Sequence, residues 1–380
     1  MKILIAPNAF KQSLTARAAA EAIAEGFRMS KLSCECILFP VGDGGTGTGP
    51  LITAHFGGTK IPVTTQDPLG RAVVAEYGLI DQGRTAVIEV ASASGIQLLA
   101  DHELDPLRAS TYGTGVLIRH ALRLGVRKFV IGVGGSATVD GGAGLLQALG
   151  VRFFDGNGRE LAGYPADLKH IAYIDWSNLE AGYQQSEVTV LCDVDNPLLG
   201  TKGGIRMFGC QKGASDSDIE SLEAILTTYI DLLQKRAKVN LRTLPSGGAA
   251  GGVCVGLHAI GNIQFVNGIE HFLALTGFDE RLSCVQWVVT GEGSIDEQTL
   301  RGKAPFGVAK RAKRKGLPVI ALVGMRPGRI PEELNSYFDS IFAIGNAPMD
   351  FGSAVGLTKA NLIEVAKQIG NTMAMCIDAK

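Results

Sequence analysis

Runs of consecutive apolar residues alternate with glycine-rich loops and amphipathic stretches along this chain. Residues 3–6 predict a buried strand, and apolar positions three or four apart from Ala20 to Phe27 predict a helix capped by Thr15. The same succession returns late in the chain, with strands predicted at 287–289, 319–323 and 341–344 and helices at 305–316 and 362–373. Such runs are typical of a parallel sheet that is covered on both faces.

The pattern changes in the middle of the chain. Short strands at 61–63, 73–79 and 86–90 alternate with turn residues, which predicts an antiparallel meander. Buried strands follow at 129–133 and 188–191, a hairpin is indicated at 155–158, and Ser217 with Glu220 forms the pattern of a helix capping box. We therefore predict an α/β protein in which residues 1–57 and 284–380 form one discontinuous domain. A mixed α/β domain, residues 58–283, is inserted into it.

The stretch from Phe129 to Gly150 combines a strand, a glycine loop and a helix. In such a loop the glycines permit tight turns, and the N–H groups at the helix start point at negative charge. This arrangement favours anion binding. Asp140 lies inside the loop and has the opposite sign, so it indicates a metal ion or a proton acceptor. The alternative is a tight turn capped by an aspartate.

Further candidate residues follow predicted strands. Asp43 lies in a second Asp-Gly-Gly loop, and Lys11 lies beside a helix start. Asp193 and Asp195 would point the same way if strand geometry persists, and would then repel each other unless a cation or a shared proton relieves them. Lys212 is a candidate partner for phosphate or carboxylate. The alternatives are turns and solvated lysines, and the glycine-rich segment 246–252 is either a ligand loop or a closely packed helix.

Composition narrows the classes of function. Hydrophobic residues make up 46% of the 380 and charged residues 19%, which provides for a sizeable core, and 50 glycines supply the loops. The formal net charge is -1 and no basic stretch is interleaved with aromatics, so nucleic acid is not an expected partner. The seven cysteines form no CxxC pattern, and no apolar run is long enough for a membrane span. We expect a cytoplasmic enzyme with no membrane partner.

The loops taken together resemble the type I glycerate kinase family of bacteria. The resemblance covers nearly the whole chain and rests on the order and spacing of short motifs. They are Ala6-Pro7 with Phe10-Lys11, Gly42 to Gly45, Tyr112 to Gly115, Gly134 to Thr138, Asp140 to Gly144, Cys192 to Leu198, Gln211 to Ala214, Ala249 to Gly252, Thr290 to Gly293, Ile295-Asp296, Gln298-Thr299 and Gly302 to Pro305.

The resemblance implies an ATP- and Mg²⁺-dependent kinase that phosphorylates D-glycerate, with the 2-hydroxyl preferred as acceptor. It also implies a flavodoxin-like domain with a second α/β domain inserted, and an active-site cleft between them. Neither the phosphorylated hydroxyl nor the oligomeric state follows from the sequence, and a homodimer stays open. Phosphoryl transfer needs a carboxylate near the hydroxyl, cations near the phosphates and one or two carboxylates for Mg²⁺.

Site roles follow from matching the family motifs to this chain. Asp193 is the predicted base, with Lys11 and Asp140 as further catalytic candidates; Lys11 and Lys212 would hold phosphate or the glycerate carboxylate. The predicted nucleotide-binding residues are Gly134, Gly135, Ser136, Thr138, Gly141, Gly142, Lys212 and Glu292. The predicted metal ligands are Asp43, Asp195 and Asp296, with Asp195 alternatively orienting the base. Lys303 also matches the family pattern.

Several positions depart from the family pattern. Asn8-Ala9 replaces the usual Asp-Ser, Thr46 and Val116 replace Glu, Val139 replaces Asn, Ser294 replaces Arg, and Val266-Asn267 replaces Arg-Pro. These changes leave open a kinase for a longer aldonic acid, a glycerate 3-kinase, or a non-catalytic protein that binds nucleotide or acid. A dinucleotide oxidoreductase is disfavoured because the loop lacks a proper GxGxxG with a ribose-binding acid at the usual distance. A P-loop kinase is excluded because GxxxxGK[ST] is absent.

Overall fold

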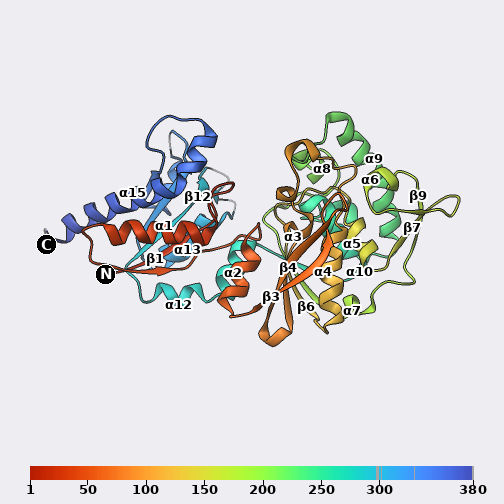
Figure 1. The fold of residues 1–380 in the computed structure, drawn as a ribbon, viewed down its shortest axis with the longest axis horizontal. Helices are drawn as coiled ribbons and strands as arrows, with labels where there is room; N and C mark the ends of the chain where they lie inside the picture. Colours follow the sequence, from red (N-terminus) through yellow and green to blue (C-terminus); the bar gives the residue numbers. More distant parts are fainter. Residues whose placement is uncertain (297–298, 301, 329, 379–380) are drawn as a thin grey trace. The chain divides into compact units, whose positions relative to one another are not determined.

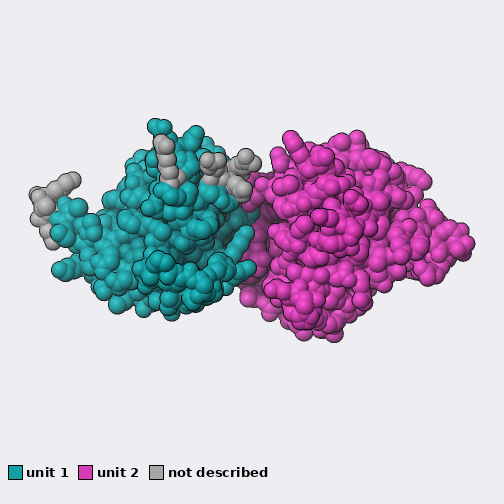
Figure 2. All heavy atoms as spheres, turned by 90° about the horizontal axis from the view of Figure 1, so that it is seen from above, with its two compact units in different colours: residues 1–43, 269–380 teal, residues 44–268 magenta. Residues whose placement is uncertain are grey.

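The computed structural model describes residues 1–296, 299–300, 302–328 and 330–378; Gln298 of the family pattern lies outside them. The chain divides into two compact units, which Figure 2 colours separately. Unit 1 contains residues 1–43 and 269–380, and unit 2 contains residues 44–268. Each unit has its own hydrophobic core, one built around Ile3, Phe27 and Leu322 and the other around Phe129, Phe153 and Leu226.

Unit 1 is built on a five-stranded parallel sheet in the order β14-β13-β12-β1-β2. The strands are β1 (Lys2–Pro7), β2 (Glu35–Leu38), β12 (Trp287–Ser294), β13 (Val319–Met325) and β14 (Ser340–Ala343). Counted within the unit, this is the 2-1-3-4-5 order of flavodoxin-like folds, with its topological switch point between β1 and β12. The predicted discontinuous flavodoxin-like unit is therefore confirmed.

Helices cover this sheet, as Figure 1 shows for α1, α13 and α15. The helices of this unit in the described residues are α1 (Ala16–Met29), α11 (Gly268–Leu275), α12 (Phe278–Leu282), α13 (Ala304–Arg314), α14 (Glu332–Asn335) and α15 (Phe351–Asp378). The predicted cap of α1 is confirmed, because the Thr15 side chain accepts from the Ala18 N–H. Helices α1 and α15 pack closely, and a Cβ added at Gly26 would lie 2.3 Å from the Ile363 carbonyl oxygen.

Unit 2 contains a six-stranded mixed sheet in the order β11-β10-β6-β5-β4-β3. The strands are β3 (Thr59–Gln66), β4 (Ala72–Ile80), β5 (Thr85–Glu89), β6 (Lys128–Gly132), β10 (Glu187–Leu191) and β11 (Ile263–Val266). Strands β3, β4 and β5 are antiparallel, as the meander predicted. On its other edge β5 pairs in parallel with β6, and β10 and β11 continue that direction, so the sheet is mixed.

A smaller antiparallel sheet in the order β8-β7-β9 completes the strands of unit 2 in the described residues. Its strands are β7 (Arg152–Asp155), β8 (Glu160–Leu161) and β9 (Ile171–Asp175), and the β7–β8 pair confirms the predicted hairpin. The helices are α2 (Thr48–His55), α3 (Ala91–Ser94), α4 (Tyr112–Arg123), α5 (Ala143–Ala148), α6 (Pro165–Leu168), α7 (Ala181–Gln184), α8 (Gly204–Phe208), α9 (Asp216–Gln234) and α10 (Val253–Ile260).

The capping box of α9 differs from the prediction. The cap is Ser215, whose side chain accepts from the Asp218 N–H while the Asp218 carboxylate accepts from the Ser215 N–H. The predicted pair, Ser217 and Glu220, lies two residues further on, inside the helix. Both pairs satisfy the same local pattern, and the chain begins the helix at the first of them.

The compact units divide after Asp43 and Gly268, before the boundaries predicted at 57 and 283. The first difference arises because α2 packs on β4 and β5 of unit 2. The second arises because α11 and α12 are tied to α13 of unit 1, where Arg311 pairs with Glu270 at 2.9 Å and with Asp279 at 2.8 Å. Among the described residues, no helix is both long enough and apolar enough to cross a membrane.

Candidate functional site

A cluster of charged side chains lies where strands β1 and β12 of unit 1 end. Lys11 follows β1, Glu292 lies near the end of β12, and Asp296 lies two residues after that strand. The ends of these two strands flank the switch point of the sheet, where ligands bind in open α/β folds. The charges of Lys303, Asp43, Lys11 and Asp296 all act on the Glu292 carboxyl. The predicted residues of unit 1 therefore form one electrostatic cluster.

Glu292 is the buried member of this cluster, with 9% of its surface exposed. Burial raises the pKa of its carboxyl to about 8; Asp43 and Asp296 raise it as well, while Lys303 and Lys11 lower it. In the described part of the chain its Oε1 atom has no hydrogen-bond partner. A buried polar atom without a partner is costly, so this oxygen is a candidate contact for a bound group.

Asparagine at position 8 changes how Asp43 is held. The Asn8 amide donates from Nδ2 to Asp43 Oδ2 at 2.8 Å and accepts the Ala9 N–H through Oδ1. The aspartate usual in the family would place a second carboxylate against Asp43, and the two would repel unless a cation or a proton lay between them. In this chain the neutral amide of Asn8 donates to Asp43 instead, so no such repulsion arises.

The predicted metal ligands do not all lie in one unit. Asp43 and Asp296 belong to unit 1, whereas Asp195 belongs to unit 2 and is exposed. Among the described residues, no group of three or more His, Cys, Asp or Glu side chains could hold a metal ion. Mg²⁺ needs only one or two carboxylates because it keeps several of its waters. Asp43, with the unpartnered oxygen of Glu292 in the same cluster, therefore fits Mg²⁺.

The glycine loop of unit 2 is organised around Asp140, whose side chain is completely buried. Its Oδ2 accepts from the Thr111 N–H at 2.8 Å, the Thr111 hydroxyl at 2.7 Å and the Gly144 N–H at 3.1 Å, and its Oδ1 accepts from the Gly142 N–H at 3.0 Å. Burial raises the pKa of Asp140, and these four hydrogen bonds oppose that shift. Through these hydrogen bonds the Asp140 carboxylate holds the glycine loop in one conformation.

Lys212 is also buried and reaches into the same loop. Its Nζ donates to the Ser136 hydroxyl and to the Thr138 carbonyl, both at 2.8 Å. Burial lowers the pKa of Lys212 to about 7, although the charge of Asp140 acts in the opposite direction. Thr138 Oγ1 is a further buried atom with no hydrogen-bond partner in the described part of the chain. Hydrogen bonds thus involve four predicted nucleotide-binding residues in or beside the glycine loop: Ser136, Thr138, Gly142 and Lys212.

Glycines let other segments approach this loop closely. Gly135, Gly141 and Gly142 have φ angles of 77°, 65° and 77°, which favour glycine. A Cβ at Gly134 would lie 2.7 Å from Gly45 Cα, so the second Asp-Gly-Gly loop abuts the first. A Cβ at Gly251 would lie 1.9 Å from the Thr138 carbonyl oxygen. The glycines of segment 246–252 therefore serve close packing against the loop.

Asp193 follows strand β10 and is exposed. Its Oδ1 accepts from Asn267 Nδ2 at 3.1 Å and from the Gly268 N–H at 2.8 Å. Strand β10 ends at Leu191, so the strand geometry that would have aligned Asp193 with Asp195 does not persist. Two donors from beyond β11 orient Asp193, one of them the asparagine that departs from the family pattern.

Glu89 is a buried acidic residue near the glycine loop that the sequence analysis did not single out. It ends strand β5 opposite Gly132 of β6, is 7% exposed, and accepts the Gly49 N–H through Oε1 at 2.7 Å. Gly132 directly precedes the glycine loop, so Glu89 lies beside that loop's first residues. The available signal was a glutamate within the apolar run 86–90, where a strand buried on both faces has no need of a charge.

Comparisons with known proteins agree on one family. The family model described as "Glycerate kinase family" matches residues 3–374. The chain is 40% identical to a protein named glycerate kinase from Halalkalibacterium halodurans, over 97% of both chains. It is 37% identical to a protein named glycerate 2-kinase from Escherichia coli K12, over 99% of this chain and 98% of the other.

A solved structure shows the same similarity over the complete fold. It comes from Salmonella typhimurium LT2 and carries the name glycerate kinase 2. It matches with a TM-score of 0.83 and 38% sequence identity, over 100% of this chain and 99% of that one. The two-unit α/β architecture described above is therefore similar to that of a solved structure along its entire length.

Proposed function

Because the chain belongs to the glycerate kinase family, we propose that it transfers the γ-phosphoryl group of ATP to the 2-hydroxyl of D-glycerate. The kinase activity follows from the family. The choice of the 2-hydroxyl is supported by the name of the Escherichia coli relative, glycerate 2-kinase. A glycerate 3-kinase is the alternative within the same reaction class.

The observation that carries the proposal is Asp193, an exposed carboxylate oriented by two N–H donors. We assign it as the general base. As the glycerate oxygen attacks the γ-phosphorus, Asp193 takes the hydroxyl proton, and the bond from phosphorus to the bridging oxygen of ADP breaks. Because the carboxylate is already held in one orientation, the proton transfer has a smaller entropic barrier.

The glycine loop and the lysines serve the phosphates in this proposal. The N–H groups of Gly135 and Ser136 would face the phosphates, because the Gly134 N–H already donates to the Gly44 carbonyl. Lys212 provides a donor that two hydrogen bonds hold in place. Lys11 would hold either a phosphate or the glycerate carboxylate. Asp140 acts through the shape of the loop, because its oxygens are already engaged by four donors.

Asp43 would be the principal ligand of Mg²⁺ in this proposal, and Glu292 and Asp296 belong to the same electrostatic cluster of unit 1. When bound there, Mg²⁺ would neutralise negative charge on phosphate oxygens. Asp195 would act on the proposed base, Asp193, through the negative charge of its carboxylate.

An ADP-release assay over a panel of sugar acids tests the proposal, with the product hydroxyl identified by phosphorus NMR. We expect Mg²⁺-dependent turnover with D-glycerate and a 2-phosphoglycerate product. Turnover with a four-carbon aldonic acid but not with D-glycerate would overturn the substrate assignment, for which Thr46 and Ser294 would be the first residues to examine. ATP binding without turnover of any acid would support a non-catalytic binding protein.

A further inference from the structure

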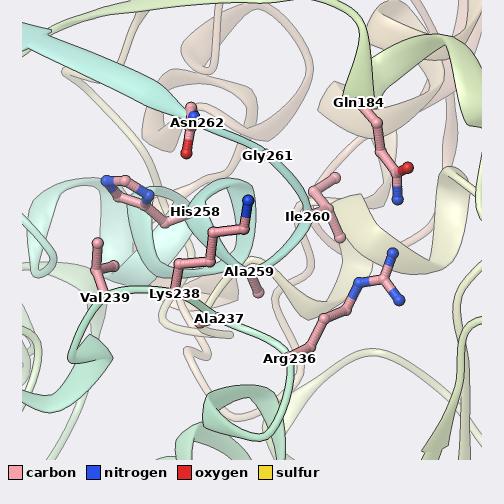
Figure 3. Close-up of a pocket in the computed structure, with 10 residues that line it drawn as sticks. All are labelled: Gln184, Arg236, Ala237, Lys238, Val239, His258, Ala259, Ile260, Gly261 and Asn262. Atoms are coloured by element: carbon pink, nitrogen blue, oxygen red, sulfur yellow. The ribbon is translucent and has the colours of Figure 1, made fainter.

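A cavity of about 350 Å³ lies in unit 2 at the amino ends of strands β10 and β11. Figure 3 shows its lining. Gln184 comes from the end of α7, Arg236 and Lys238 follow α9, His258 lies in the last turn of α10, and Asn262 directly precedes β11. The volume is within the range of small-molecule sites. The ends of three helices and the residue before β11 therefore line one concave surface that has both polar and apolar side chains.

This cavity is separate from the candidate active site. Strand β10 begins next to it and leads towards Asp193, and β11 begins next to it and leads to Asn267 and Gly268, which hold Asp193. The two ends of each strand lie roughly 10–13 Å apart, at about 3.3 Å per residue. A ligand in the cavity would therefore lie at the amino ends of these two strands, whereas the proposed base lies beyond the carboxyl end of β10.

The side chains that line the cavity carry a net positive charge, which Arg236 and Lys238 supply. No acidic residue is among the residues described as lining it. Among the described residues, neither the Arg236 nor the Lys238 side chain makes a hydrogen bond or an ion pair; Arg236 instead lies over the Trp176 ring at 4.9 Å. By contrast, nearby Arg242 pairs with Asp231 at 2.6 Å. Stacking on Trp176 holds the guanidinium in place while leaving its donors to face a ligand.

The helix ends at the cavity favour a ligand that has hydroxyl groups in addition to an anionic group. Helices α7, α9 and α10 all end at the cavity, and the last carbonyl groups of a helix carry partial negative charge. They offset part of the charge of Arg236 and Lys238 and can accept hydrogen bonds from hydroxyl groups. The side-chain amides of Gln184 and Asn262 add donors and acceptors. A suitable ligand combines an anion with hydroxyl groups.

We propose that this cavity binds a small hydroxylated phosphate monoester. A phosphate monoester carries a charge of about −1.5 to −2 at pH 7, and Arg236 and Lys238 are the two cationic side chains in the lining that can bind it. Its oxygens suit the fork of the Arg236 guanidinium, and its hydroxyl groups meet the helix-end carbonyls and the Asn262 amide. The site is an addition to the proposed kinase centre and does not depend on its substrate.

Titration calorimetry with glycerol 2-phosphate, at constant ionic strength, tests this site in the full chain. The variant Arg236→Gln/Lys238→Gln removes both cations. The control Lys169→Gln/Lys235→Gln removes the same charge from two exposed lysines of unit 2 that are not among the residues lining the cavity. Circular dichroism and thermal melting confirm that both variants fold, as expected for exposed side chains.

We expect glycerol 2-phosphate to bind the wild-type protein and the control with equal affinity. We expect binding to the Arg236→Gln/Lys238→Gln variant to be weakened at least about tenfold. Equal affinity for all three proteins would overturn the proposal, as would an absence of binding to the wild-type protein. Malonate is the anion comparison; if it binds the cavity as tightly as glycerol 2-phosphate, the assignment to a phosphate ester is wrong.

Discussion

Three carboxylates near the proposed sites differ in their surroundings and therefore in what they can do. Asp140 is fully buried and accepts four hydrogen bonds. Glu292 is buried with one oxygen unpartnered in the described residues. Asp193 is exposed and oriented by Asn267 and Gly268. Only Asp193 combines access to a substrate hydroxyl with a fixed orientation, and the residue-scale predictions follow from these differences.

Replacing Asp193 by asparagine should lower kcat by roughly 10²–10⁴ while leaving ATP affinity and the fold nearly unchanged. Asparagine retains an acceptor oxygen for the Asn267 and Gly268 donors but cannot take a proton at neutral pH. Steady-state kinetics measures the effect. Asp195→Asn is the matched control, with a smaller loss of kcat, because it removes one charge near Asp193 but leaves the proposed base in place. A near-normal kcat for Asp193→Asn would place the base elsewhere.

Replacing Glu292 by glutamine should remove a pH dependence of stability. In the unfolded chain Glu292 loses its proton near the ordinary pKa of 4.5, whereas burial raises its pKa in the folded protein to about 8. Between these values the unfolded chain binds fewer protons, so the free energy of unfolding falls as pH rises from 4.5 to 8. Glutamine stays neutral, so at pH 7 the variant should be more stable by about 2–3 kcal/mol.

Urea unfolding of the Glu292→Gln variant at pH 5, 7 and 9 checks this prediction. Glu280→Gln changes an exposed glutamate in the same unit and should stay within about 0.5 kcal/mol of the wild type. A variant that is less stable than the wild type at pH 7 would show that ionised Glu292 has a stabilising partner.

The sequence identified most of these residues but not their environments. Asp140 and Asp193 stand out in glycine-rich or strand-end positions, yet their donors lie far along the chain: Thr111 is 29 residues from Asp140, and Asn267 is 74 residues from Asp193. Local sequence carries no information on such pairs. Glu89 was missed for the same reason, since its significance comes from the strand and helix that meet beside it.

At the scale of elements, prediction succeeded where the signal is local. The strand, glycine loop and helix of residues 129–150 and the 155–158 hairpin follow from the spacing of apolar, glycine and turn residues. The parallel pairing of β5 with β6 was not predicted, because β6 begins 39 residues after β5 ends and the pairing depends on the whole sheet. The α9 cap was misplaced because Ser215 and Ser217 each fit the pattern.

The contact between α1 and α15 can be tested at Gly26. A Cβ there would lie 2.3 Å from the Ile363 carbonyl oxygen and 2.7 Å from Ala366 Cβ, so Gly26→Ala should force the helices apart. We expect a destabilisation of about 1–3 kcal/mol, the usual cost of overpacking. Chemical denaturation followed by circular dichroism measures it.

Gly356→Ala supplies the matched comparison for that experiment. Gly356 lies on the exposed face of α15 with nothing within 4 Å of an added Cβ. Alanine is the better helix former, so this variant should gain about 0.5–1 kcal/mol. If both glycine variants change stability in the same direction, the close approach of α1 and α15 is not what Gly26 provides.

At the scale of the whole molecule, the two cores share no residues, and unit 2 is a continuous segment. We therefore expect residues 44–268 to fold without the rest of the chain and to unfold cooperatively, because their core of Phe129, Phe153 and Tyr229 is complete within the segment. Thermal unfolding of that fragment, followed by near-UV circular dichroism, tests this. A fragment that lacks a cooperative transition would show that unit 2 depends on unit 1.

The split of unit 1 also bears on how the protein is made. Strand β1 lies between β2 and β12, so one of its edges stays unpaired until β12 leaves the ribosome. At about 5–20 residues per second, translation of the intervening unit 2 takes roughly 10–45 s. During that time Ile3, Leu4 and Ile5, fully buried in the finished protein, have no core to enter. Unit 2 can fold during translation, whereas unit 1 must close afterwards, and until then the unpaired edge of β1 is a place where a strand of another chain can pair.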